Sequence, residues 1–273
     1  MVPGIPGAVW RRRAESEVPS RLAGAVDAGP GTDLLDERLL FALPGIARYL
    51  VAQGRAIDFA PADGADPDAV QLFLNGSARG FLIQQRGELA LEAAALRSPD
   101  GRCLAIAGHS GEGKSTIAAT LCRRGWSLVA DDITRVTWTG TRAVAWPSDR
   151  SVQLWRNACE ALGADPENLK QVRTGLQKYF LPLQPHEEPC VLTGIVQLRA
   201  IAGFALSPCP PPGRGILLGN AAFRQHIATE FPAREKYRET LAAIASACAA
   251  YTLEGARHAS VEQLADAIEG VGE

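Results

Sequence analysis

The sequence predicts an α/β protein in which helices flank a mixed β-sheet, with a small β-rich region toward the N-terminus. A short apolar run at residues 103–107 passes through a glycine-rich turn into a stretch with helical spacing. A second apolar run at 126–130 follows one helix later and ends in two adjacent aspartates. Shorter strand-like runs before both of them account for the β-rich region.

The N-terminal third of the sequence changes character near residue 36. Residues 1–35 are rich in Pro, Gly, Ala and charge with weak periodicity, and we expect a tail or an edge there. Strands are predicted at 46–51 and 56–60, and a helical stretch from 69 to 88. A strand over 89–96 then leads to a turn. The predicted organisation is a tail or edge at 1–35, a β-rich and helical region at 36–90, and a main domain at 91–273.

The second half predicts further elements of the main domain. A hairpin is expected from 136–138 and 143–146, and a late core strand at 191–198. Helices are expected at 154–162, 221–229 and 234–250, with a proline-rich loop at 209–213. A last helix begins with Ser260 and Gln263 at capping-box spacing.

Residues 108–115 read Gly-His-Ser-Gly-Glu-Gly-Lys-Ser and match the pattern G-x-x-x-x-G-K-[ST] of a P-loop. Glycines are needed because backbone N–H groups must wrap a phosphate closely. Lys114 would reach the outer phosphates, and the Ser115 hydroxyl would ligate magnesium. The predicted nucleotide-binding residues are Gly108, Ser110, Gly111, Glu112, Gly113, Lys114, Ser115 and Thr116. The alternative is a fortuitous glycine-rich turn, but the strand before and the helix after favour binding of ATP and Mg²⁺.

Asp131 and Asp132 follow the second apolar strand. Adjacent carboxylates repel each other unless a cation or a proton transfer uses them. A magnesium ion held by a P-loop hydroxyl and by an aspartate at a strand end is the usual arrangement for phosphoryl transfer. The alternative is a solvated Asp-Asp turn that caps a later element.

Composition limits the class of protein. The formal net charge is −2, with 47% hydrophobic and 21% charged residues, which does not suggest a nucleic-acid binder. The six cysteines form no C-x-x-C pair and, with the four histidines, no zinc spacing. The first residues are too broken by Pro and Gly for a signal peptide, and no apolar run reaches the length of a membrane span. We therefore expect a soluble, cytoplasmic protein that binds neither nucleic acid nor membrane.

The motif at 108–115, followed after one helix by Leu-Val-Ala-Asp-Asp at 128–132, resembles the catalytic domain of HPr kinase/phosphorylase. The resemblance extends over about residues 45–200. It implies a P-loop core similar to phosphoenolpyruvate carboxykinase, and a protein related to the short stand-alone kinases, some of which tailor peptides, lasso peptides among them. It also suggests a homo-oligomer.

The resemblance implies roles for four residues. Asp131 matches the aspartate that accepts the proton of the substrate serine hydroxyl. Asp132 and Ser115 match magnesium ligands, and Lys114 matches the lysine on the β- and γ-phosphates. Loose phosphoryl transfer needs such positioning and charge neutralisation more than covalent help.

The sequence departs from the family in three ways. Glu92 stands where the family has a histidine; it either replaces that histidine as a proton acceptor or metal-side carboxylate, or is a salt-bridged strand residue. The E-[IV]-R-G signature of the phosphorylase activity is absent after the hairpin. The large N-terminal domain of the bifunctional enzymes is missing or replaced by the first 90 residues.

The resemblance assigns no role to two other polar residues, Lys178 and His109. Lys178 precedes a predicted core strand and either reaches a transferred phosphate or is a surface loop lysine. His109 lies at a variable position of the P-loop and is expected to be a bystander.

The leading hypothesis is an ATP-dependent serine kinase that acts on a small protein or peptide, with Asp131, Lys114, Glu92 and Lys178 as its candidate catalytic residues. A nucleotide-binding regulatory protein without phosphotransfer and a small-molecule kinase are the alternatives. The sequence carries no motif for the acceptor.

Overall fold

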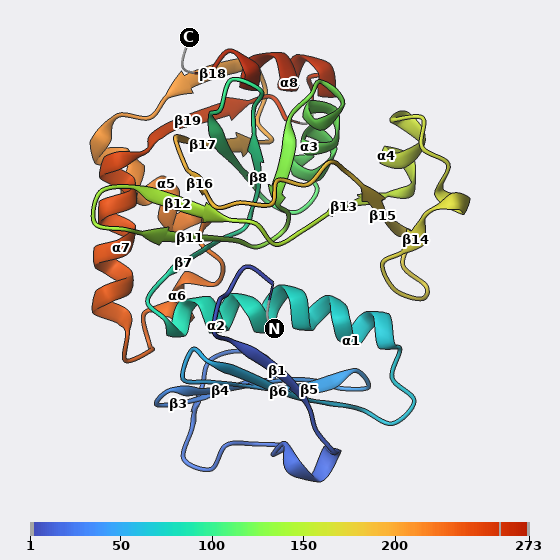
Figure 1. Ribbon diagram of the computed structural model, residues 1–273, viewed down its shortest axis with the longest axis vertical. Coiled ribbons are helices and arrows are strands. Elements are labelled where there is room, and N and C mark those ends of the chain that lie inside the picture. Colours follow the sequence, from blue (N-terminus) through green and yellow to red (C-terminus); the bar gives the residue numbers. More distant parts are fainter. Residues whose placement is uncertain (1–2, 257, 272–273) are drawn as a thin grey trace.

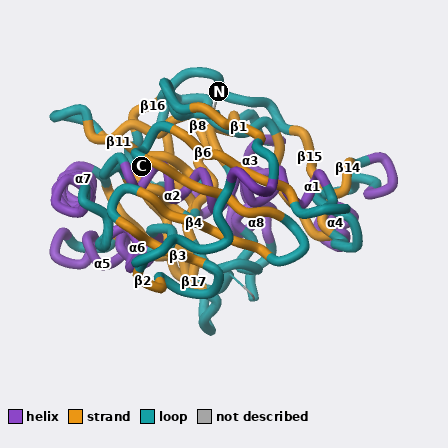
Figure 2. Tube along the Cα trace, turned by 90° about the horizontal axis from the view of Figure 1, so that it is seen from below, coloured by secondary structure: helices purple, strands orange, loops and turns teal. Residues whose placement is uncertain are grey.

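The computed structural model describes residues 3–256 and 258–271, and the strands in this part of the chain form four β-sheets with helices between and around them. Figure 1 shows an N-terminal sheet at the bottom, a helical layer above it and the remaining sheets at the top. In the view from below (Figure 2), α5 and α7 lie at one end of the molecule, and α4 lies with β14 and β15 at the other. The fold is mixed α/β.

The N-terminal sheet has the order β1-β6-β5-β4-β3-β2, with β1 parallel to β6 and the other pairs antiparallel. Its strands are β1 (Val9–Arg12), β2 (Val26–Asp27), β3 (Thr32–Leu35), β4 (Arg38–Leu43), β5 (Ala47–Ala52) and β6 (Ala56–Pro61). The segment expected as a tail or an edge thus supplies both edge strands and β3, with a 3₁₀ turn at Glu15–Glu17 between β1 and β2. Its strands are only two to four residues long, too short for a clear alternating pattern.

A helical layer covers this sheet. It consists of α1 (Pro67–Phe73), a π-helical turn at Leu74–Ala78, and α2 (Arg79–Gln85), which follow one another without a break (Figure 1). Asp66 begins the layer, because its side chain caps α1 by accepting from the N–H of Asp68.

The central sheet carries the glycine-rich segment. Its order is β10-β8-β9-β17-β19-β18, and β9, β17 and β19 run parallel. The strands are β8 (Ala93–Arg97), β9 (Cys103–Ala107), β10 (Ser127–Ala130), β17 (Gly194–Arg199), β18 (Ala205–Pro208) and β19 (Ala249–Glu254). Alternate residues of β9 enter opposite core clusters: Cys103 and Ala105 pack with α5 (Pro211–Ala221) and α7 (Arg234–Ala247), and Leu104 and Ile106 with α3 (Lys114–Arg123) and α8 (Val261–Glu269). Helices therefore cover both faces.

Two smaller sheets complete the fold. One has the order β16-β12-β11-β7, all antiparallel, and the other the order β13-β15-β14 with α4 (Arg156–Ala161) against it. Their strands are β7 (Leu89–Leu91), β11 (Thr134–Trp138), β12 (Ala143–Trp146), β13 (Ser151–Trp155), β14 (Lys170–Gln171), β15 (Lys178–Pro182) and β16 (Cys190–Val191). A 3₁₀ turn at Pro166–Asn168 and the short α6 (Gln225–Ala228) are the remaining elements named here.

Several predicted elements are divided differently in the structure. The strand predicted at 89–96 is β7 and β8, which belong to separate sheets and meet at Glu92. The strand predicted at 191–198 is likewise divided between β16 and β17. The helix predicted at 154–162 begins only after β13, and the one at 234–250 ends before β19. The helix predicted at 221–229 is the short α6, and α5 begins inside the proline-rich loop expected at 209–213. The two divided strand stretches are largely apolar, so periodicity alone did not separate their parts.

The N-terminal region and the main domain share one core. A single apolar cluster joins Phe41 and Tyr49 of the N-terminal sheet and Phe81 of α2 to Ile133 and Phe223. The predicted domain boundary between residues 90 and 91 falls inside β7. In the described residues no helix has both the length and the apolar character needed to cross a membrane.

Candidate functional site

The glycine-rich loop connects β9 to α3 at the carboxyl end of the strand. Gly111 and Gly113 have φ angles of 87° and 91°, which side chains other than glycine rarely adopt. A Cβ on Gly108 would lie 2.7 Å from Glu112 Oε2 and 3.1 Å from Leu198 Cβ. The three glycines are therefore required by the shape of the loop, whether for conformation or for space.

Lys114, the first residue of α3, folds back over the loop. Its Nζ donates to the carbonyls of Gly108 (2.6 Å) and His109 (3.2 Å). Burial lowers the pKa of Lys114, while the carboxylates of Asp131 and Asp132 act in the opposite direction. The ammonium group thus lies against the loop backbone, near enough to Asp131 and Asp132 to be attracted by their negative charges.

Glu112 stabilises the loop from inside. Its buried carboxylate accepts from the N–H groups of His109 (2.6 Å) and Ala200 (3.2 Å). The structure therefore gives this predicted nucleotide-binding residue backbone partners, which tie the loop to the end of β17. Ser110 is exposed at the tip of the loop, and Thr116 lies half-buried in the first turn of α3.

Asp131, directly after β10, is buried and lies opposite the start of α3. Its carboxylate accepts from Ser115 Oγ (3.0 Å) and from the N–H of Gln153 (3.1 Å). Burial raises the pKa of Asp131 to about 7, with the negative charges of Asp132 and Asp149 adding to the rise. A carboxyl in this state can bind a cation or exchange a proton near neutral pH.

Asp132 has a different environment. It is exposed and has a φ angle of 65°, a conformation uncommon for residues other than glycine. Its Oδ2 lies 3.5 Å from the position that a Cβ on Gly76 of the π turn would occupy. Ser115 is thus paired with Asp131, whereas the resemblance implied Asp132 as its partner in metal binding.

A cavity of about 250 Å³ opens on the aspartates. Its walls come from the helical layer, the three-stranded sheet and the loop before β13, and its polar lining includes Asn75, Arg79, Asp131, Asp132 and Asp149. Asp149 accepts from the N–H of Asp131 (3.1 Å) and lies 3.6 Å from Arg79 Nη2. Asn75, Arg79 and Asp149 were not predicted, because they belong to no motif and only the fold brings them to this place.

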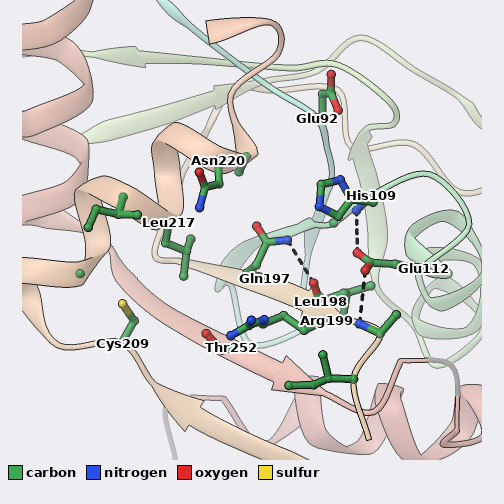
Figure 3. A pocket seen from close by; sticks show the side chains of 16 residues that line it. Glu92, His109, Glu112, Gln197, Leu198, Arg199, Cys209, Leu217, Asn220 and Thr252 are labelled. Carbon is green, nitrogen blue, oxygen red and sulfur yellow. Dashed lines mark hydrogen bonds between the residues drawn. The ribbon is translucent and has the colours of Figure 1, made fainter.

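A larger cavity of about 720 Å³ lies beside the glycine-rich loop. Figure 3 shows Glu92, His109 and Glu112 on one side of it, and Leu217 and Asn220 of α5 across from them. The side chain of Glu92 is exposed at the break between β7 and β8, so it is not inside a strand. Although it reaches solvent, its partly enclosed position raises its pKa, and the charge of Asp132 adds to the rise.

Lys178 lies apart from this arrangement. It is the first residue of β15, with its Nζ 5.9 Å from the centre of the Trp155 ring, and it is not in the lining of either cavity. His109 is exposed in the loop and lines the larger cavity.

The donor set at the loop suits magnesium bound together with a nucleotide. Ser115 and Asp131 offer hard oxygen donors within hydrogen-bond distance of each other. Among the described residues, no three His, Cys, Asp or Glu side chains are grouped so that they could hold a metal ion by themselves. At a nucleotide, Mg²⁺ is usually held by one or two protein oxygens plus phosphate oxygens.

Comparison with known proteins gives a limited result. No protein-family model and no curated protein matches the chain. Among solved structures, it is similar to the HPr(Ser) kinase/phosphatase from Coxiella burnetii, with a TM-score of 0.35 and 11% sequence identity, over 66% of this chain and 93% of that chain.

Proposed function

We propose that the chain is an ATP- and Mg²⁺-dependent kinase that transfers the γ-phosphoryl group to a serine hydroxyl of a small protein or peptide. The observation that carries the proposal is the hydrogen bond of 3.0 Å between Ser115 Oγ and Asp131, beside the glycine-rich loop and Lys114. The Ser115 hydroxyl, the ammonium group of Lys114 and the carboxylates of Asp131 and Asp132 thus lie near one another. Phosphoryl transfer needs groups of these kinds.

The nucleotide phosphates would lie in the loop at the N-terminus of α3. Free N–H groups and the dipole of this ten-residue helix favour a bound anion there. Lys114 would exchange its present contacts with the carbonyls of Gly108 and His109 for the outer phosphate oxygens. Ser115 and Asp131 would hold Mg²⁺, which when bound neutralises charge on the β- and γ-phosphates.

In the transfer step, the acceptor hydroxyl oxygen forms a bond to the γ-phosphorus while the bond to the β–γ bridging oxygen breaks, and ADP leaves. The hydroxyl proton passes to a carboxylate. Asp132 suits this task because it is exposed next to Asp131 and lines the small cavity. Glu92 is a second candidate for this task, because its carboxylate lies near enough to Lys114 and Asp132 to interact with their charges.

The test combines binding and transfer. Purified protein is titrated with a fluorescent ATP analogue with and without Mg²⁺, and then incubated with radiolabelled ATP and serine-containing peptides encoded by neighbouring genes. Mg²⁺-dependent binding and a phosphoserine product are expected from the parent. Asp131→Asn and Asp132→Asn should each reduce transfer at least about 100-fold.

A matched control is Asp63→Asn, because Asp63 is an exposed aspartate that lines neither cavity. This control should transfer at the parental rate. If Asp131→Asn transfers as fast as the parent, the proposed function is wrong.

Glu92 in place of the family histidine favours one alternative, a nucleotide-binding regulatory protein without transfer. That alternative predicts Mg²⁺-dependent nucleotide binding and no phosphorylated product with any peptide pool. Intact-mass spectrometry of the peptides distinguishes the two outcomes.

A further inference from the structure

The two cavities border different parts of the candidate site. The larger one is lined by Gly108, His109 and Glu112 of the glycine-rich loop, and the smaller one by Asp131 and Asp132. No residue lines both. An acceptor hydroxyl must reach a carboxylate that takes its proton, so the small cavity is the place where the acceptor can meet the aspartates.

Two buried polar atoms in the wall of the small cavity have no hydrogen-bond partner among the described residues: Asn75 Oδ1 and Arg79 Nε. The Arg79 side chain is only 4% exposed, and its Nη2 already binds the carbonyl of Ile133 (2.7 Å). A buried polar atom without a partner destabilises the fold, so most buried polar groups in native proteins have a hydrogen-bond partner. Six such atoms occur among the described residues, and these two lie in the wall beside the aspartates, where a bound group would supply the missing partners.

The π turn explains why these two residues face the site. Leu74–Ala78 interrupts the α-helical spacing between α1 and α2 at the point where Gly76 approaches Asp132. Such turns are frequent at functional sites because they change the direction in which side chains project. The helical layer, which belongs to the N-terminal region, thus contributes directly to the wall of the cavity.

The chemistry of the two atoms limits the ligand. Asn75 Oδ1 accepts a hydrogen bond and Arg79 Nε donates one, so together they complement a group with one N–H and one C=O, as in a peptide amide. The charged side chains that line the cavity are four aspartates and two cations, and this acidic excess disfavours an anionic acceptor; they are Asp68, Asp131, Asp132, Asp149, Arg79 and Lys170. Its volume of about 250 Å³ lies below that of pockets for drug-sized ligands, so a single residue fits rather than a larger molecule.

We propose that the small cavity is the acceptor subsite, which recognises the peptide amide next to the target serine through Asn75 and Arg79. The inference rests on the proposed kinase function and deepens it. The serine lies in an extended segment, with its amide N–H donating to Asn75 Oδ1, its amide C=O accepting from Arg79 Nε and its hydroxyl near Asp132.

The test measures binding in the full chain by saturation-transfer NMR, with N-acetyl-L-serinamide as the probe, without nucleotide and with an Mg²⁺-bound non-hydrolysable ATP analogue. Saturable binding to the parent is expected. Asn75→Leu removes the acceptor at similar volume and should weaken binding at least tenfold, and Arg79→Met should do the same. Ser77→Ala is the matched control, because Ser77 belongs to the same π turn but lines neither cavity; it should bind the probe like the parent.

Three results would overturn the inference: no binding of N-acetyl-L-serinamide to the parent, undiminished binding to Asn75→Leu, or equal binding of 1,2-propanediol, which has hydroxyls but no amide. Because Arg79 also holds the Ile133 carbonyl, Asn75→Leu decides the result if Arg79→Met does not fold. Titration with the fluorescent ATP analogue separates the two proposals. Amide binding without ATP binding contradicts the kinase function alone, whereas ATP binding without amide binding contradicts the acceptor subsite.

Discussion

At the scale of single residues, Lys114 supplies the positive charge at the glycine-rich loop. Its Nζ binds two loop carbonyls, and under the proposed function it would bind phosphate oxygens at this place. A hydrogen bond to a charged group contributes about 1.5–3 kcal/mol. Lys114→Met should therefore weaken MgATP binding roughly 10- to 100-fold, measured by fluorescence titration.

Arginine should not replace this lysine, because its planar, larger head group does not act as a compact point charge. Lys114→Arg is thus expected to bind MgATP almost as weakly as Lys114→Met. The exposed Arg142, in the turn between β11 and β12, provides the control Arg142→Met, which should keep parental affinity. Parental affinity of Lys114→Met would show that the loop does not bind the phosphates through this residue.

Glu92 allows a prediction about pH. Its pKa is raised, chiefly by its partly enclosed position. A proton acceptor works only when deprotonated, so if Glu92 has this role, the transfer rate of the parent rises with pH through that raised pKa. Glu92→Gln should lower the rate roughly 100-fold and remove this rise, and Glu92→His should restore part of the rate. A Glu92→Gln variant with the parental rate and pH profile would exclude Glu92 from the proton transfer.

At the scale of elements, the packing of α2 against the segment before α6 depends on Gly80. A Cβ at this position would lie 2.7 Å and 2.8 Å from ring atoms of Phe223. Gly80→Ala should therefore overpack the contact and lower the free energy of unfolding by about 1–3 kcal/mol, measured from urea denaturation. Gly215→Ala is the matched control, since nothing lies within 4 Å of its Cβ position in α5. It should be neutral or stabilise by up to about 1 kcal/mol; equal effects of the two changes would contradict this account.

The same scale shows what sequence patterns can and cannot predict here. The strand before the glycine-rich loop, the helix after it and the strand that ends in Asp131 were predicted in place, because each combines an apolar run with a clear start or stop. The break at Glu92 was missed. β7 is fully buried and β8 is buried except for Arg97, so the apolar residues on either side of Glu92 show no alternation that would reveal two strands. The bend that separates the two sheets is a property of the tertiary fold.

The site residues likewise divide into those that a local pattern identifies and those that only the tertiary fold brings together. Local motifs singled out Lys114, Ser115 and Asp131, which lie close together in the sequence at the start of α3 and directly after β10. Asn75 and Arg79 are more than 50 residues from Asp131 in the sequence, and they reach it only because the helical layer packs against the main domain. Long-range contacts of this kind leave no local pattern.

At the scale of the whole molecule, the N-terminal region and the main domain share a hydrophobic cluster. Ile133, Phe223, Ile227 and Phe231 of the main domain are buried in one cluster with residues of the N-terminal sheet and α2. The buried Arg135 adds a polar link, because it pairs with Glu88 and donates to the carbonyl of Gly4. The division of the sequence at residue 90 passes through this shared cluster, whereas another cluster lies wholly within the main domain.

This shared core predicts the behaviour of a truncated chain. A fragment of residues 89–273 would expose the four main-domain members of the cluster, at a cost of about 6–12 kcal/mol if each fully buried side chain contributes about 1.5–3 kcal/mol. That cost is comparable to the whole stability of a typical domain. The fragment should therefore lack a cooperative thermal transition by near-UV circular dichroism and should bind ANS. Co-expression with residues 1–88 is the control, and it should restore the transition because the cluster can form again between the two pieces. A lone fragment that unfolds cooperatively at the temperature of the full chain would show instead that the main domain is stable without the N-terminal region, and that the wall of the small cavity formed by Asn75 and Arg79 is supplied by a separable part.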